Sequence, residues 1–235
     1  MTSGEPLVRW DWIAGHLDEI ALRLGEHVEL AGIAIVVGLA IAFALSLFVL
    51  RFGWLEQPTT FVTGTLYTIP SLALFALLIP YTGLSILTAE IGLVGYTLLI
   101  LVRNIVGGIR SVPAEVREAA RGMGYSGPRL FWEVELPLAL PVIVAGIRIA
   151  TITTIGLVTV TALIGQGGLG YLILIGIQRF FSTPLLVGAV LSVALAIAAD
   201  GALVIVQRAL TPWSREPQRV RTPDRAEPGL IPPPP

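Results

Sequence analysis

The sequence SVPAEVREAARGMGYSGPRLFWEVELP, residues 111–137, is a charged island between two strongly apolar segments. Within it, three residues separate Glu118-Ala119-Ala120 from Gly124, and nine more separate Gly124 from Val134-Glu135-Leu136-Pro137. The apolar segments on either side can cross a bilayer, whereas the charges between them favour water. The pattern predicts an all-α polytopic membrane protein that presents this island to a soluble partner.

The composition supports a membrane protein over most of the chain. Hydrophobic residues make up 54% of the 235 residues, and charged residues only 13%. Soluble domains average about 25% charged residues, because their surfaces face water. The net charge of −1 gives no reason to expect nucleic acid as a partner.

Residue types that are missing exclude several kinds of chemistry. The chain has no lysine, so all fifteen basic residues are arginine. A Walker-type nucleotide site needs a lysine on its glycine loop, so we expect no ATP hydrolysis by that route here. Cysteine is absent, which excludes disulfides and thiolate metal ligands. His16 and His27 both precede the first apolar span, so we expect no metal site and no histidine proton relay in the membrane.

Five segments are long and apolar enough to span a bilayer core of about 30 Å, which takes roughly 20 helical residues. They are residues 30–50, 59–80, 84–102, 138–163 and 184–206. Pro70 lies near the middle of the second span and should kink it, because proline lacks a backbone donor. Residues 169–181 cover only about 20 Å as a helix and are expected to be re-entrant or to lie at the interface. The alternative is six spans, with this stretch forced across.

The arginines predict the orientation, because positively charged loops stay in the cytoplasm. With five spans, one side receives only Arg9, Arg23 and Arg179. The other side receives Arg51, Arg103, Arg110, Arg117, Arg121, Arg129, Arg208, Arg215, Arg219, Arg221 and Arg225. The loop 104–137 and the C-terminus are therefore expected in the cytoplasm of a cell-membrane protein, and the N-terminus outside. Six spans would export the arginine-rich tail.

The two terminal segments differ from the membrane domain, residues 30–210. Residues 1–29 do not resemble a signal peptide, and their apolar residues recur at helical spacing from Trp10 to Leu24. We expect an amphipathic helix there, lying on the outer interface or packed on the bundle. Residues 211–235 contain eight prolines and are expected to be a disordered tail.

The island itself reads as two short helices around a tight turn. Ser111 is a candidate N-cap, with Pro113 in the first turn. Gly124 can end the first helix with a positive φ. A second helix over 129–135 should stop before Pro137. Small side chains at Ala119 and Ala120 would let a partner's backbone approach closely, and a carboxylate at Glu118 could orient that contact.

This spacing resembles the cytoplasmic coupling loop of ABC importer permeases. Thr68-Ile69-Pro70-Ser71-Leu72-Ala73-Leu74, Arg103-Asn104 with Gly108-Ile109-Arg110, and Ala162-Leu163-Ile164-Gly165 through Gly170 look like the branch that imports glycine betaine, carnitine and choline. The similarity covers roughly residues 27–208. It implies the five-span type I importer fold, and it implies a transport subunit that is not an enzyme.

The resemblance also implies partners and site residues. The ATPase contact would consist of Glu118, Ala119, Ala120, Gly124 and Pro137. The partners would be an ATPase dimer, a second identical or related permease, an extracytoplasmic substrate-binding protein and the bilayer. No cofactor is expected in this chain, because ATP and magnesium would belong to the ATPase. Substrate affinity is expected to lie in the binding protein.

Three ionisable residues lie within the predicted spans, where charges are costly. Arg148 and Asp200 have comparable depths, so we expect them to form a buried ion pair that either locks the bundle or lines the pathway. Glu90 has no basic residue at its depth and either lines a water-filled pathway or snorkels outward. Together with Pro70, these residues are the candidate pathway set.

Other functions are compatible with parts of the pattern. A permease for another small solute, such as an amino acid, would share the coupling loop. A proton-coupled carrier would be expected to show inverted repeats and a midplane carboxylate or histidine, and no internal repeat is visible. An intramembrane enzyme would need a nucleophile with a histidine partner or a metal-ligand cluster.

Overall fold

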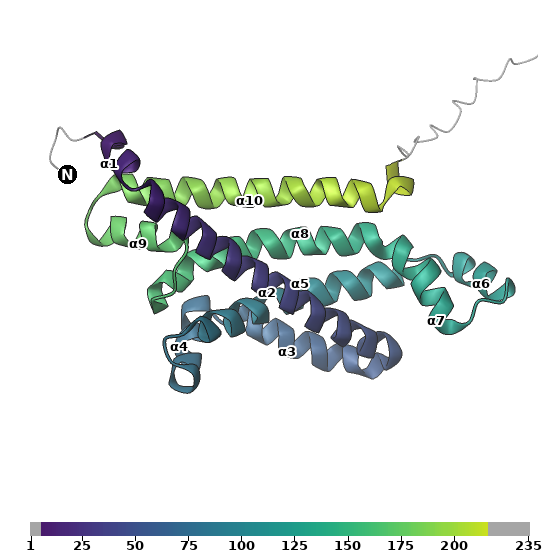
Figure 1. Cartoon of the computed structure of the whole chain (residues 1–235). Coiled ribbons are helices and arrows are strands. Elements are labelled where there is room, and N and C mark those ends of the chain that lie inside the picture. Colours follow the sequence, from purple (N-terminus) through teal and green to yellow (C-terminus); the bar gives the residue numbers. More distant parts are fainter. Residues whose placement is uncertain (1–5, 216–235) are drawn as a thin grey trace, which may run out of the picture.

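The computed structural model describes residues 6–215, and every regular element within that range is a helix (Figure 1). In chain order these are α1 (Trp10–Gly15), α2 (Leu17–Arg51), η1 (Gly53–Leu55), α3 (Glu56–Thr68), α4 (Ser71–Thr82), α5 (Ile86–Arg110), α6 (Ala114–Gly122), α7 (Gly127–Leu130), η2 (Phe131–Glu135), α8 (Leu136–Thr161), η3 (Ala162–Ile164), α9 (Leu169–Gln178), α10 (Ser182–Leu210) and η4 (Pro212–Arg215). Most of the predicted disordered tail lies outside the described residues, but residues 212–215 form one helical turn.

Within the described range, four helices are long and apolar enough to cross a membrane: α2, α5, α8 together with the short helices flanking it, and α10. The bent pair α3–α4 makes a fifth if it counts as one span. The six-span alternative would need α9 to cross. With ten residues, α9 is only about 15 Å long, which is half of a bilayer core.

The second span is broken at Pro70, which goes beyond the predicted kink. Helix α3 ends at Thr68, α4 begins at Ser71, and the two axes differ by 99°. Ile69 and Pro70 both have extended ψ angles, of 128° and 134°. The residue before a proline avoids the helical region, so the helix ends rather than bends. The Tyr96 hydroxyl donates a hydrogen bond to the freed Ile69 carbonyl.

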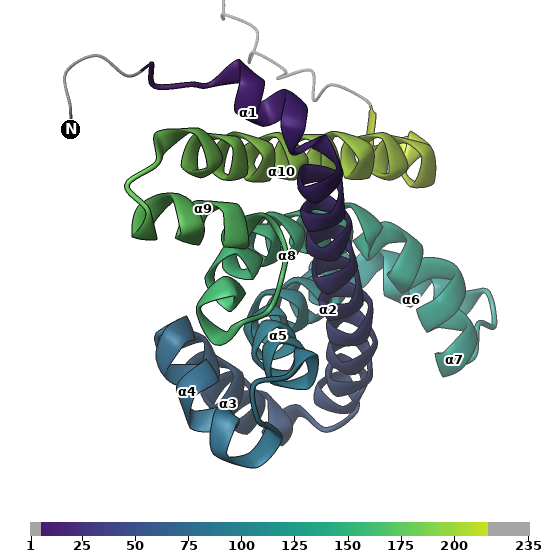
Figure 2. The same cartoon turned by 60° about the vertical axis from the view of Figure 1, so that its left-hand side comes forward.

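The predicted boundary between residues 29 and 30 is not a break in the helix. Helix α2 runs without interruption from Leu17 to Arg51, about 52 Å, so residues 17–29 extend the first span. The separate N-terminal helix is only α1, which Figure 2 shows beside one end of α10. Thr183 Oγ1 accepts a hydrogen bond from the Arg9 backbone N–H at 3.0 Å, which anchors the preceding segment to α10.

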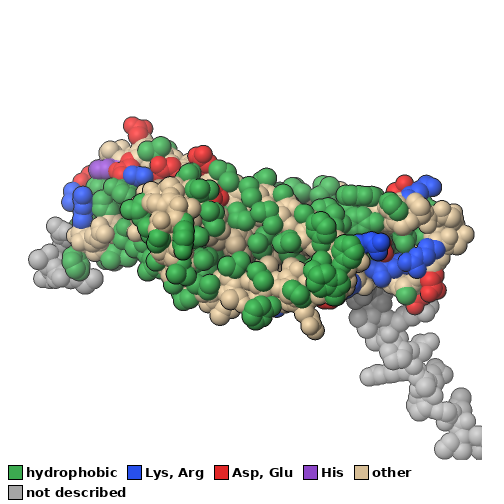
Figure 3. All heavy atoms as spheres, turned by 90° about the horizontal axis from the view of Figure 1, so that it is seen from below, with side chains coloured by type: hydrophobic (Ala, Val, Ile, Leu, Met, Phe, Trp, Pro, Cys, Tyr) green, Lys and Arg blue, Asp and Glu red, His purple; other side chains and the backbone are tan. Residues whose placement is uncertain are grey.

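Helix α5 lies at the centre and packs mainly on α2 and α8. Small residues allow these close approaches: an added Cβ at Gly146 of α8 would collide with the Asn104 side chain of α5. Helix α10 packs on α8 and α9 and exposes an apolar face that includes Val190, Val193 and Ile197. Figure 3 shows hydrophobic side chains covering the middle of the molecule, with charged side chains gathered at its two ends.

Candidate functional site

Helices α6 and α7 project beyond the end of the long-helix bundle (Figure 1). The first helix of the island forms as predicted, but Ser111 is not its N-cap. Helix α6 begins at Ala114 with Pro113 at the N-cap position, and the Ser111 hydroxyl instead donates to the Gly108 carbonyl at 2.8 Å. The prediction of Ser111 as N-cap was therefore wrong. Pro113 itself has an extended ψ of 143°, so the helix starts after the proline.

The other end of α6 closes as the sequence predicts. Gly124 has a φ of +85°, which favours glycine. The Tyr125 N–H donates to the Ala120 carbonyl at 3.1 Å, and the Gly124 N–H donates to the Arg121 carbonyl at 2.9 Å. These two bonds form a Schellman motif, which satisfies carbonyls that the helix end leaves free. A side chain at position 124 would strain the turn that joins α6 to α7.

The predicted partner-contact residues differ in exposure. Glu118, Ala119 and Gly124 are exposed on the projection, whereas Ala120 is 2% exposed. Ala120 is covered by the chain itself, so little of its surface is open on the projection, and its role in a partner contact stays a prediction. Its small size allows α6 to pack closely. The roles of Glu118, Ala119 and Gly124 stay predictions.

The sequence predicted that the second helix of the island would stop before Pro137, but in the structure the helix continues past that residue. Helix α7 continues through a π-helical turn, η2, directly into α8. Across that turn the Leu136 N–H bonds to the Phe131 carbonyl, five residues back. Pro137 follows in the first turn of α8, where a missing donor is tolerated. Pro137 is only half-buried, and its role as a contact also stays a prediction.

Arg117 fastens the projection to the bundle. Its guanidinium lies 2.9 Å from the Glu135 carboxylate and donates to the Ile109 carbonyl, in α5, at 2.6 Å. The two charged side chains are 26% and 15% exposed. Sequence reasoning missed this pair, because residues 18 positions apart on different helices share no periodic signal.

Arg148 and Asp200 meet, as their predicted depths suggested. Arg148 Nε lies 2.7 Å from Asp200 Oδ1, and Nη2 lies 2.9 Å from Oδ2, so the contact is bidentate. The side chains are 30% and 28% exposed, which is less buried than expected. Gln207, which sequence reasoning missed, accepts a bond from Arg148 and donates to the Pro141 carbonyl, both at 3.3 Å. The structure joins α8 to α10 here, and whether the pair also lines a pathway stays a prediction.

Glu90 lies apart from these groups on α5. Both of its carboxylate oxygens are buried, and neither has a hydrogen-bond partner among residues 6–215. The structure therefore does not bring the candidate pathway residues Glu90, Pro70, Arg148 and Asp200 into one cluster of contacts. The role of Glu90 stays a prediction.

Two polar residues of α2 hold the glycine-rich loop that precedes α9. Glu26 Oε2 accepts from the Gly168 N–H at 2.8 Å, and His27 Nδ1 accepts from the Leu169 N–H at 3.2 Å. Because Nδ1 accepts, His27 Nε2 carries the proton and donates to the Ile155 carbonyl of α8 at 3.0 Å. His27 is completely buried, although the sequence placed it before the first span. The only feature of the sequence that could have indicated the burial of His27 is the run of apolar residues beside it, at positions 28, 30 and 31.

Residues 34–212 match the family described as binding-protein-dependent transport system inner membrane component. The chain belongs to this family. The permease is 39% identical over 205 residues to the osmoprotectant import permease protein OsmW of Salmonella typhimurium, covering 85% of this chain and 94% of that protein. It is 36% identical over 194 residues to the glycine betaine/carnitine/choline transport system permease protein OpuCB of Bacillus subtilis, covering 83% and 89%.

Solved structures confirm the fold of the permease. A chain of the MetNI methionine ABC transporter superimposes with a TM-score of 0.73 at 24% identity, covering 82% of this chain and 96% of that chain. A chain of an amino acid ABC transporter gives a TM-score of 0.68 at 17% identity, covering 86% and 99%. The family resemblance and the type I importer fold predicted from the sequence are thus confirmed. The permease is a membrane-spanning transport component, and its family implies an ATPase and a binding protein as partners.

Proposed function

We propose that this permease forms the translocation pathway of an ATP-driven importer for quaternary ammonium osmoprotectants such as glycine betaine, carnitine and choline. Its relatives in Salmonella typhimurium and Bacillus subtilis, an osmoprotectant permease and a glycine betaine/carnitine/choline permease, support this substrate class. A second permease, identical or related, would complete the pathway, because four or five spans are too few to enclose one.

The α6–α7 projection faces the cytoplasm in this proposal, as does the C-terminus, and the N-terminus lies outside. The arginine bias supports that orientation, since Arg110, Arg117, Arg121 and Arg129 all lie at the projection end. The projection would then meet the ATPase dimer. Glu118 and Ala119 are exposed on it and available for that contact.

The coupling mechanism that we propose rests on one observation: the projection contacts two spans through the same side chain, Arg117. Arg117 bonds the last residues of α5 through Ile109 and the start of α8 through Glu135. A displacement of α6 by the closing ATPases would therefore move α5 and α8 together, because both are held by one side chain. Their movement would alternate access to the pathway between the two sides of the membrane.

The test is uptake of radiolabelled glycine betaine, carnitine and choline by proteoliposomes that hold the permease with its ATPase and binding protein. We expect uptake that requires internal ATP and persists when the proton gradient is collapsed. Uptake that follows the proton gradient without ATP would overturn the proposal in favour of a secondary carrier. Uptake of amino acids alone would retain the ABC mechanism and replace the substrate.

A further inference from the structure

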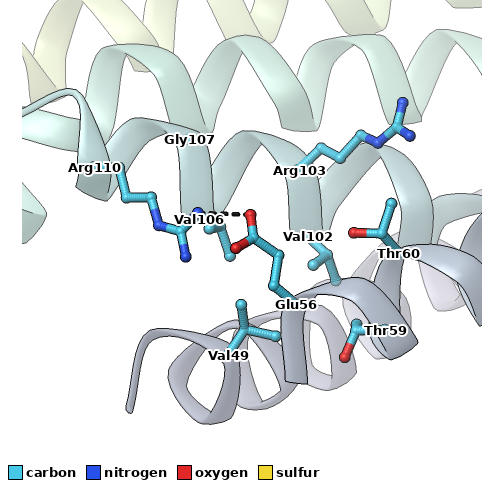
Figure 4. A pocket seen from close by; sticks show the side chains of 9 residues that line it. All are labelled: Val49, Glu56, Thr59, Thr60, Val102, Arg103, Val106, Gly107 and Arg110. Atoms are coloured by element: carbon cyan, nitrogen blue, oxygen red, sulfur yellow. Dashed lines mark hydrogen bonds and ion pairs between the residues drawn. The ribbon is translucent and has the colours of Figure 1, made fainter. Parts of the chain in front are cut away.

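A groove lined by hydroxyl groups and an arginine among apolar side chains runs along the side of the bundle between α3 and α5. Two cavities of about 280 and 460 Å³ lie along it and share Thr60 and Arg103. The first reaches the projection end, where Glu56 and Arg110 form an ion pair at 2.6 Å (Figure 4). The second extends toward the helix break. This second cavity, called the α3–α5 groove from here on, is lined by Thr60, Phe61, Gly64, Thr65, Tyr67, Thr68, Leu99 and Arg103.

This lining is unusual for a surface at membrane depth. Thr65, Tyr67 and Thr68 of α3 are exposed beside the exposed Phe61, whereas the exposed face of α10 carries valine and isoleucine without hydroxyl groups among them. Apolar side chains suit lipid tails, and hydroxyl groups suit water or a polar solute. The contrast indicates that the groove faces an aqueous space in the assembled importer rather than lipid.

The groove also ends beside broken backbone. Helix α3 ends at Thr68, within the groove, and α4 begins at Ser71. Non-helical backbone at membrane depth is tolerated where it is buried in protein or lines a water-filled cavity. Discontinuous spans mark the substrate sites of many transporters, near the middle of the bilayer. Tyr96, which bonds the freed Ile69 carbonyl, is close to the middle residue of α5.

Tyr67 presents an aromatic surface at this point. Its side chain is 39% exposed, and its ring meets the ring of the buried Tyr96 edge-on, with centroids 5.8 Å apart. Tyr96 is itself held by its bond to the Ile69 carbonyl. The ring of Tyr67 is thus supported from behind and accessible from the groove. A quaternary ammonium group binds such a ring face through cation–π attraction.

Arg103 supplies a positive charge farther along the same groove. It lies seven residues after Tyr96, two helical turns along one face of α5, or about 10 Å. Its guanidinium forms no hydrogen bond or ion pair with any residue from 6 to 215. Figure 4 shows its side chain extending past Thr60 and away from the Glu56–Arg110 pair. An unpaired guanidinium in such a place is suited to a carboxylate.

We propose that the α3–α5 groove is a substrate subsite for zwitterions, with Tyr67 receiving the quaternary ammonium group and Arg103 the carboxylate. The inference rests on the proposed function, since it concerns the same substrates. It adds a selectivity: glycine betaine and carnitine satisfy both residues, whereas choline lacks a carboxylate and brings only its positive charge near Arg103. Arg103 is then a specificity-determining residue of the permease, separate from selection by the binding protein.

The experiment measures uptake of glycine betaine and choline by the complete importer, with one binding protein throughout, for Arg103→Gln and Tyr67→Leu. Arg103→Gln should lower glycine betaine uptake about tenfold relative to choline, because it removes a charge-assisted contact that choline never makes. Tyr67→Leu should lower uptake of both solutes, and Tyr67→Phe should restore it, because phenylalanine keeps the ring face. ATP hydrolysis stimulated by the binding protein, measured alongside, shows that each variant assembles.

Two matched controls come from outside the groove. Arg51→Gln removes an exposed arginine at the end of α2, and Tyr81→Leu removes a tyrosine that is 87% exposed on α4. Neither should change the uptake ratio of the two solutes.

Different failures remain distinguishable. A wild-type importer that moves none of the three solutes overturns the proposed function and this subsite with it. Wild-type uptake of glycine betaine with an unchanged ratio in Arg103→Gln overturns the subsite alone, as does an importer that moves only choline. The competing occupant of Arg103 is a lipid phosphate. If Arg103→Gln lowers both solutes equally, and only in vesicles that contain anionic lipid, the residue serves the membrane and the proposal is wrong.

Discussion

Arg117 and Glu135 form an ion pair at 2.9 Å that joins the first helix of the projection to the π turn leading into α8. The same guanidinium donates to the Ile109 carbonyl near the end of α5. One side chain therefore links three segments that the linear sequence separates. Because both charged groups are largely buried, the link is shielded from competing water and salt.

Replacing Arg117 should weaken this link without removing the projection. Arg117→Met keeps most of the apolar stem but removes the charged donor to the Ile109 carbonyl, at a cost of about 1.5–3 kcal/mol, and leaves Glu135 without its ion-pair partner. We expect more ATP hydrolysed per solute imported, because motion of α6 reaches α5 and α8 less completely. The measurement is the ratio of ATP turnover to uptake in proteoliposomes. Arg121→Met, an exposed arginine on the same helix, is the control, and an unaltered ratio in Arg117→Met would refute the coupling route.

Ala119 and Ala120 are neighbours in sequence, but their substitution should have opposite effects. Ala120 is 2% exposed, so Ala120→Leu overpacks its site and should cost about 1–3 kcal/mol of stability. Ala119 is exposed, so Ala119→Leu should leave the melting temperature of the purified permease unchanged and weaken ATPase binding through a steric clash. Thermal unfolding and co-purification of the ATPase measure the two effects separately. Equal losses of stability would contradict the burial difference.

The sequence predicted the features that depend on neighbours in the chain. Apolar length located the four long spans, Gly124 located the end of α6, and Pro70 located the break in the second span. It failed where the outcome depends on three-dimensional context. The π turn before Pro137 lets the helix continue, and Ala120 is buried although its neighbour Ala119 is exposed. The Arg117–Glu135 pair and the His27 contacts join separate helices, so no local pattern could indicate them.

His27 should contribute to stability through the loop before α9. His27→Leu keeps an apolar side chain but leaves the buried Leu169 N–H without a partner, at about 1–3 kcal/mol, and removes a second bond to the Ile155 carbonyl, which stays bonded within α8. We expect a clear fall in the melting temperature and faster proteolysis near residues 165–168. His16→Leu is the matched control, because His16 is partly exposed and bonds only within its own turn, to the Trp12 carbonyl. A melting temperature for His27→Leu equal to that of the control would show that the loop does not depend on this contact.

Substitutions of Arg148 and Asp200 can show whether this ion pair holds the bundle together or lines the translocation pathway. Asp200→Asn leaves the guanidinium without its bidentate partner, between α8 and α10, where lipid cannot replace a carboxylate. We expect the yield of assembled importer to fall several-fold. The exchange Arg148→Asp with Asp200→Arg restores opposite charges at the same two positions and should recover most of that yield. Yield is measured by size-exclusion chromatography in detergent and uptake in parallel. If both variants assemble normally and transport equally poorly, the pair serves the pathway, and its role in joining α8 to α10 is secondary.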